Sequence, residues 1–122
     1  MPVKNILVVD DSPTERFFSV DFLTKAGYQV TTAENGEEGI AKAKATKPDL
    51  ILMDVVMPGR NGFQACRDLK SDDRFKGIPI VLCTSKGQES DKFWGQQQGA
   101  NGYVVKPFKA EDLVAAVKRA LN

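Results

Sequence analysis

The chain has 122 residues, 27% of them charged and 42% hydrophobic, and its formal net charge of +1 excludes the strong positive field of a general nucleic-acid binder. No apolar run approaches the length of a membrane span and the N-terminus lacks a signal-peptide pattern, so we expect one cytoplasmic domain over residues 1–122, without membrane insertion. The chain contains no histidine, which excludes a histidine-based catalytic triad, a histidine metal site and a phosphohistidine carried by this chain.

The first predicted elements are a buried strand and a helix. An unbroken apolar run at residues 5–9 predicts the strand. Ser12 and Pro13 then predict a helix start, with Ser12 as the cap, and the helix is expected to run to about Lys25. Phe17 lies outside its apolar stripe. That stripe is expected to contain residues at helical spacing, namely Phe18, Phe22, Leu23 and Ala26.

The second quarter of the chain predicts a more exposed strand, a helix and a central strand. Residues 28–33 alternate in polarity, which favours the exposed strand. Asn35 and Glu38 have capping-box spacing at the start of a helix over residues 36–46. The apolar run that begins at Ile51 predicts a strand buried on both faces, and it stops at the carboxylate of Asp54.

The second half of the chain repeats this alternation. A helix over residues 62–70 is expected to place Cys66 inward, and a buried strand over 78–84 contains the second cysteine; both thiols are expected to be reduced core residues. A polar helix over 88–98 carries the only tryptophan, Trp94. Residues 102–105 then predict a fifth strand. The last helix has the clearest apolar period, formed by Leu113, Ala116, Val117 and Ala120.

Five strands alternating with five helices predict an α/β fold, a doubly wound five-stranded parallel sheet with helices on both faces. The carboxyl ends of parallel strands meet at one edge of the sheet. Polar residues stand at four of the five strand ends, and we expect them to converge: Asp10, Asp11, Asp54, Thr84 and Lys106.

This set of residue types suits phosphoryl transfer to a carboxylate. Crowded carboxylates repel one another, and Mg²⁺, which takes oxygen ligands, relieves that repulsion. Asp54 is the expected nucleophile, and Lys106 and Mg²⁺ would neutralise charge on the transferring phosphoryl group. The Thr84 hydroxyl could then sense the new phosphoryl oxygens through hydrogen bonds.

The sequence resembles the receiver domains of two-component response regulators along its whole length. The motifs are Val8-Val9-Asp10-Asp11-Ser12, Leu52-Met53-Asp54-Val55-Val56-Met57-Pro58-Gly59, Thr84, and Gly102-Tyr103-Val104-Val105-Lys106-Pro107-Phe108. The resemblance implies a CheY-like sheet of order 2-1-3-4-5, Asp54 as phosphoacceptor and a cis Lys106-Pro107 bond.

The resemblance also implies a ligand set and a switch. Asp11 would bind Mg²⁺ directly, Asp10 mainly through water, and the backbone carbonyl of Val56 would be the third protein ligand beside Asp54. Thr84 and Tyr103 would form a relay that turns on phosphorylation.

Within the family, the stretches 11–15, 61–65 and 94–100 are most similar to stand-alone PilH-type regulators of type IV pilus twitching motility. This similarity implies a monomer that takes its phosphoryl group from a separate, CheA-like sensor histidine kinase and is not a classical enzyme. The downstream target is unknown from the sequence.

Several alternatives remain open from the sequence. A haloacid-dehalogenase-like phosphatase would need an acid two residues after the nucleophile, where this chain has Val56. A flavodoxin-like cofactor binder would need a phosphate loop where Asp10 and Asp11 stand. A pseudo-receiver that only binds a partner, and a phosphate sink for a shared kinase, are compatible with the same motifs.

Overall fold

The structure, a computed structural model, describes residues 4–57, 59, 61–84 and 99–121, and for Thr84 it describes the backbone alone. Within these residues five strands form one parallel sheet in the order β2-β1-β3-β4-β5, which confirms the predicted fold class and strand order. The strands are β1 (Asn5–Val9), β2 (Gln29–Ala33), β3 (Leu50–Asp54), β4 (Ile80–Thr84) and β5 (Gly102–Val105).

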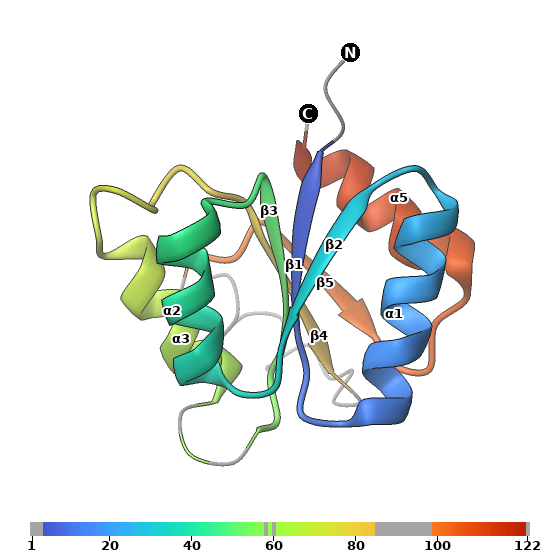
Figure 1. The fold of residues 1–122 in the computed structure, drawn as a ribbon, viewed down its shortest axis with the longest axis horizontal. Coiled ribbons are helices and arrows are strands. Elements are labelled where there is room, and N and C mark those ends of the chain that lie inside the picture. The colour runs from blue at the N-terminus through green and yellow to red at the C-terminus, as the bar shows by residue number, and fades with distance from the viewer. Residues whose placement is uncertain (1–3, 58, 60, 85–98, 122) are drawn as a thin grey trace.

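Helices cover both faces of the sheet (Figure 1). They are α1 (Pro13–Lys25), α2 (Gly36–Thr46), α3 (Gly62–Lys70) and α5 (Ala110–Leu121). Figure 1 shows α2 and α3 on one face and α1 and α5 on the other, with the carboxyl ends of the strands at the lower edge. The helix predicted over residues 88–98, with Trp94, lies outside the described residues. No helix in the described part of the chain is long and apolar enough to cross a membrane.

The alternation of side chains along the central strands divides the core into two layers. In β1, Leu7 and Val9 pack on the α2 and α3 side, whereas Ile6 and Val8 pack on the α1 and α5 side. Every residue of β3 is buried, as expected for a strand covered on both faces. The edge strand β2 is only partly buried, which confirms its predicted exposure. The two packed layers leave the strand ends as the place where polar groups can gather.

The inward face of α1 differs from the prediction. Leu23 is fully buried, but Phe18 is 50% exposed, Ala26 is exposed, and Ser19 is buried in their place. A small side chain at position 19 lets this side of the helix lie close to the sheet, and the bulkier phenylalanine is left at the margin. The Phe18 ring there contacts the ring of Phe22, with centroids 6.2 Å apart. The prediction erred because it counted only apolar residues and therefore passed over the serine that the structure buries.

The start of α3 is held against the end of β3. Asn61 and Gln64 form a reciprocal capping box, in which each side chain accepts a hydrogen bond from the other residue's backbone N–H. The N–H of Gly62 donates to the carbonyl oxygen of Val55 at 2.9 Å. A Cβ atom on Gly62 would lie 2.2 Å from the carbonyl oxygen of Asp54, so only glycine permits this approach.

We therefore expect Gly62→Ala to destabilise the fold by roughly 1–3 kcal/mol, because the backbone beside Asp54 would have to move. Urea denaturation measures this change. Gly77→Ala is the matched control, because a Cβ atom there meets nothing within 4 Å. Equal stability of the two variants would show that the contact with the Asp54 backbone is not a constraint.

Candidate functional site

Three charged side chains meet where β1, β3 and β5 end. Asp10 directly follows β1, Asp54 is the last residue of β3, and Lys106 directly follows β5. The Lys106 Nζ atom lies 2.9 Å from Oδ2 of Asp10 and 3.5 Å from Oδ2 of Asp54. Asp10 is 3% exposed, Asp54 is 6% exposed and the Lys106 side chain is 9% exposed. The predicted convergence of these strand ends is thus present as a nearly buried ionic cluster.

Asp10 is held in place by its own neighbours in sequence. Its Oδ1 atom accepts a hydrogen bond from the backbone N–H of Ser12 at 2.9 Å, and its carbonyl oxygen accepts one from Nη1 of Arg16 at 2.8 Å. Its backbone N–H donates to the carbonyl oxygen of Ala33 on the neighbouring strand. Asp10 therefore offers Oδ2 to Lys106 from a fixed position.

Glu15 is a member of the site that the sequence analysis did not single out. Its Oε2 atom lies 2.7 Å from Nζ of Lys106. Its carboxylate also forms a group with those of Asp10 and Asp54, in which one oxygen from each residue lies within 4.8 Å of the other two. The residue lies in the first turn of α1, which begins at the same sheet edge. The sequence offered one signal for this position: Glu15 stands three residues after the helix cap Ser12, which places it in the first turn of a helix that starts at this sheet edge.

Burial and charge act against each other on Asp54. The pKa of Asp54 is raised from its ordinary value of 3.8 to about 6, chiefly by burial; within that balance the ammonium of Lys106 lowers the pKa and the negative charge of Asp10 raises it. A hydrogen bond with the Val56 backbone also lowers it. The carboxylate is consequently ionised at neutral pH, but it is more basic than a carboxylate in water.

The ammonium of Lys106 is stabilised by its carboxylate neighbours. Burial opposes its charged form, but hydrogen bonds to Glu15 and Asp10 outweigh that effect and raise the pKa of Lys106 above its ordinary value of 10.5. Lys106 therefore remains a permanent positive charge beside Asp54 at any physiological pH. The bond between Lys106 and Pro107 is cis, as the family resemblance implied.

The other predicted ligands lie at the rim of this cluster. Asp11 is exposed and is not in the group of three clustered carboxylates, although its charge contributes to the raised pKa of Asp54. Val56 is also exposed and immediately follows the buried Val55. The roles of Asp11 and the Val56 carbonyl as metal ligands remain predictions.

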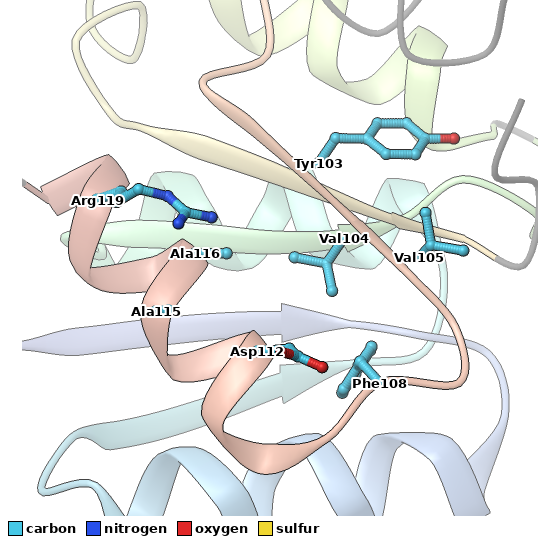
Figure 2. Close-up of a pocket in the computed structure, with 8 residues that line it drawn as sticks. All are labelled: Tyr103, Val104, Val105, Phe108, Asp112, Ala115, Ala116 and Arg119. Atoms are coloured by element: carbon cyan, nitrogen blue, oxygen red, sulfur yellow. The ribbon is translucent and has the colours of Figure 1, made fainter. Parts of the chain in front are cut away.

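The predicted switch residues lie on the two last strands of the sheet. Thr84 ends β4 and pairs with Val105 of β5, and its side chain lies outside the description. Tyr103 is half-buried and packs on the same core layer as α2 and α3. Figure 2 shows its ring on the opposite side of β5 from Val104, whose side chain points toward α5. A cavity of about 270 Å³ lies between β5 and α5. The relay between Thr84 and Tyr103 remains a prediction.

The donor set fits a hard divalent cation. Carboxylate oxygens are the ligands that Mg²⁺ takes, and Asp10 and Asp54 provide them at close range, with the Glu15 carboxylate beside them. Cys66 and Cys83 are buried, and burial raises the pKa of their thiols to about 11 and about 12. They are therefore neutral core residues, as expected, and the chemistry of the site rests on oxygen and the lysine nitrogen.

A doubly wound parallel sheet that carries buried carboxylates and a lysine at its carboxyl edge defines the receiver class of signalling domains. The family model described as the response regulator receiver domain matches residues 6–118. The chain belongs to this family.

Curated relatives support the assignment. The chain is 50% identical over 116 residues to Protein PilH of Pseudomonas aeruginosa, an alignment that covers 95% of this chain and 96% of PilH. It is 42% identical to the phosphate regulon transcriptional regulatory protein PhoB of the same organism, covering 98% of this chain but only 52% of PhoB.

Solved structures show the same fold. Chemotaxis protein CheY4 of Vibrio cholerae superposes with a TM-score of 0.92 at 35% identity, covering 98% of this chain and 99% of that chain. The receiver domain of a sensor histidine kinase from Pseudomonas aeruginosa, solved with a magnesium ion in its active-site cleft, superposes with a TM-score of 0.90 at 29% identity, covering 98% of each chain.

The raised pKa of Asp54 predicts a pH-dependent stability. The folded state holds the Asp54 proton up to about pH 6, whereas an unfolded carboxyl releases it near 3.8, so the free energy of unfolding falls as the pH rises through this window. Asp54→Asn removes the titration. In EDTA, we expect this variant to gain about 1–2 kcal/mol over the wild type above pH 6, and the gain to shrink as the pH falls toward 4. Denaturant melts across this range measure the difference; a gain that grows toward pH 4 would contradict it.

Proposed function

We propose that this protein is a phosphoacceptor that takes a phosphoryl group on Asp54 from a separate histidine kinase or phosphotransfer protein. The observation that carries the proposal is the buried cluster, in which Lys106 Nζ lies between carboxylates of Asp10 and Asp54. The chain contains no histidine, so the phosphohistidine donor belongs to another protein. Membership of the receiver family supports the same role.

The geometry supports an in-line transfer to the carboxylate. One Asp54 carboxylate oxygen forms the new P–O bond while the P–N bond to the donor histidine breaks, and the imidazole nitrogen keeps the electron pair. A pKa of about 6 keeps Asp54 ionised near pH 7. Lys106 then offers its ammonium to the phosphoryl oxygens in a site from which most water is excluded.

Mg²⁺ is the proposed cofactor. Asp10 and Asp54, with Asp11 and the Val56 carbonyl as the resemblance implies, would hold it. When bound, the ion supplies charge neutralisation on the phosphoryl oxygens. The magnesium ion in the structurally similar kinase receiver domain supports this choice.

The response is proposed to pass through Thr84 and Tyr103. A phosphoryl group on Asp54 would draw the Thr84 hydroxyl toward it, and the Tyr103 ring would turn further into the core. The half-buried position of Tyr103 on β5 supports a ring that can occupy two positions. We propose that the protein catalyses the transfer of the phosphoryl group onto and off its own Asp54 and is not a classical enzyme.

The similarity to PilH supports a more specific role. We propose that the chain is a cytoplasmic, stand-alone regulator of type IV pilus or chemotaxis-like motility, with a CheA-like kinase as donor. Phe17 and Phe18 are exposed on α1, and Phe18 lines a cleft that also reaches Lys106. This apolar surface beside the site is where we expect the donor domain to dock.

We expect acetyl phosphate with Mg²⁺ to add one phosphoryl group to the wild type and none to Asp54→Asn. The amide keeps the shape of the side chain but lacks the anionic nucleophile. Intact-mass spectrometry measures the added group. Asp73→Asn, an exposed carboxylate outside the cluster, is the control and should be labelled like the wild type. Undiminished labelling of Asp54→Asn would move the acceptor elsewhere.

We also expect Mg²⁺ to raise the melting temperature of the wild type, because an ion that binds only the folded state stabilises it. At a Mg²⁺ concentration of a hundred times the dissociation constant, the free energy of unfolding should rise by about 2.7 kcal/mol. Asp54→Asn and Asp11→Asn should each melt higher than the wild type in EDTA and respond less to Mg²⁺, because each removes a crowded charge. Thermal melts with and without Mg²⁺ test this. The same response in all three proteins would place the metal outside this site.

A further inference from the structure

We infer that Glu15 is a positioning residue that restrains Lys106 in the unphosphorylated protein and competes with the phosphoryl group for its ammonium. The inference rests on the proposed function of Asp54 and adds a residue that tunes it. Glu15 makes the shortest of the three contacts of the Lys106 ammonium with carboxylates, at 2.7 Å.

The three carboxylates share the ammonium unequally. Lys106 donates hydrogen bonds to Oε2 of Glu15 and to Oδ2 of Asp10, whereas Oδ2 of Asp54 lies 3.5 Å away and makes only an ion pair. A lysine has three N–H donors, and two of them are committed to carboxylates other than the nucleophile. The resting position of the ammonium therefore favours Glu15 and Asp10 over the site of phosphorylation.

Glu15 and Asp10 differ in how firmly they are held. Asp10 is buried and fixed by the N–H of Ser12 and by Arg16. The Glu15 side chain is 49% exposed on the first turn of α1, and its partner in the site is Lys106. The Glu15 carboxylate can therefore leave the Lys106 ammonium and turn into solvent at little cost. The Asp10 carboxylate cannot, because its hydrogen bonds hold it in place.

Phosphorylation would reverse the balance of charge. A phosphoryl group brings negative charge and three acceptor oxygens, and charge-assisted bonds to them compete directly for the Lys106 donors. The Glu15 carboxylate lies within 4.8 Å of an Asp54 oxygen, so it would also repel the new group. Both effects have the same sign: Glu15 favours the unphosphorylated state, and loss of its charge favours the phosphorylated one.

If Glu15 were a metal ligand, its removal would have the opposite effect on binding of the phosphoryl group. If Glu15 instead bound the cation together with Asp10 and Asp54, its removal would weaken the metal site and the phosphoryl site with it. The sign of the effect at saturating Mg²⁺ therefore separates a restraint from a ligand.

The test uses Glu15→Gln, which keeps the size of the side chain and removes its charge. At saturating Mg²⁺ we expect beryllofluoride, a phosphoryl mimic, to bind roughly twofold to fivefold more tightly, as fits a half-exposed ion pair. Isothermal titration calorimetry measures the affinity, and intact-mass spectrometry should show faster labelling by acetyl phosphate. Glu15→Asp, which keeps the charge but shortens the reach to Lys106, should lie between Glu15→Gln and the wild type.

Glu37→Gln is the matched control, because Glu37 also lies in the first turn of a helix but outside the clustered carboxylates, and it should bind like the wild type. Weaker or unchanged binding in Glu15→Gln would overturn the restraint, and so would an equal gain in Glu37→Gln, which would indicate a general charge effect. If the wild type is labelled at Asp54 and only the Glu15 result fails, the proposed function stands without this inference. If the wild type is not labelled, both fail.

Discussion

The ion cluster around Lys106 is the interaction on which the rest of this structure depends. An ammonium and two carboxylates that are almost completely removed from water are stable only if they stay together, because an unpaired charge in such a place is costly. Asp10 and Lys106 are 96 residues apart in the chain. The parallel sheet brings them together by ending β1, β3 and β5 at one edge. The fold is thus the scaffold that makes the cluster possible.

The scaffold is rigid where the site needs precision. The backbone around Asp54 is pressed against the start of α3 at Gly62, and β3 is covered on both faces. Tight packing of this kind leaves little room for the carboxylate to move. The first turn of α1 is different, since Glu15 reaches the same ammonium from a half-exposed position. The site therefore joins a fixed half, with Asp10 and Asp54, to an adjustable half.

This arrangement gives up some stability. Burial raises the pKa of Asp54, which means that the folded protein holds an ionised carboxylate at neutral pH in a place that disfavours it. Departures from local rules of this sort are typical of functional sites in proteins. The same departure makes Asp54 more basic than a solvated carboxylate, and the neighbouring ammonium prevents the pKa from rising further. The carboxylate that we propose as the nucleophile and its counter-charge are thereby held side by side at the edge of an otherwise apolar core.

Within the described residues, the sequence by itself determined the helices and strands and the positions of Asp10, Asp54 and Lys106, because caps, breakers and apolar runs are local signals. The helices over 36–46 and 62–70 have the predicted bounds, and the strands end where their apolar runs stop. Only the tertiary structure decided which face of α1 turns inward, so that Ser19 is buried and Phe18 is not. The same orientation of α1 places the Glu15 carboxylate within hydrogen-bonding distance of Lys106. Such choices depend on how a helix packs against the whole sheet and on how far a side chain reaches, and no local pattern contains either quantity.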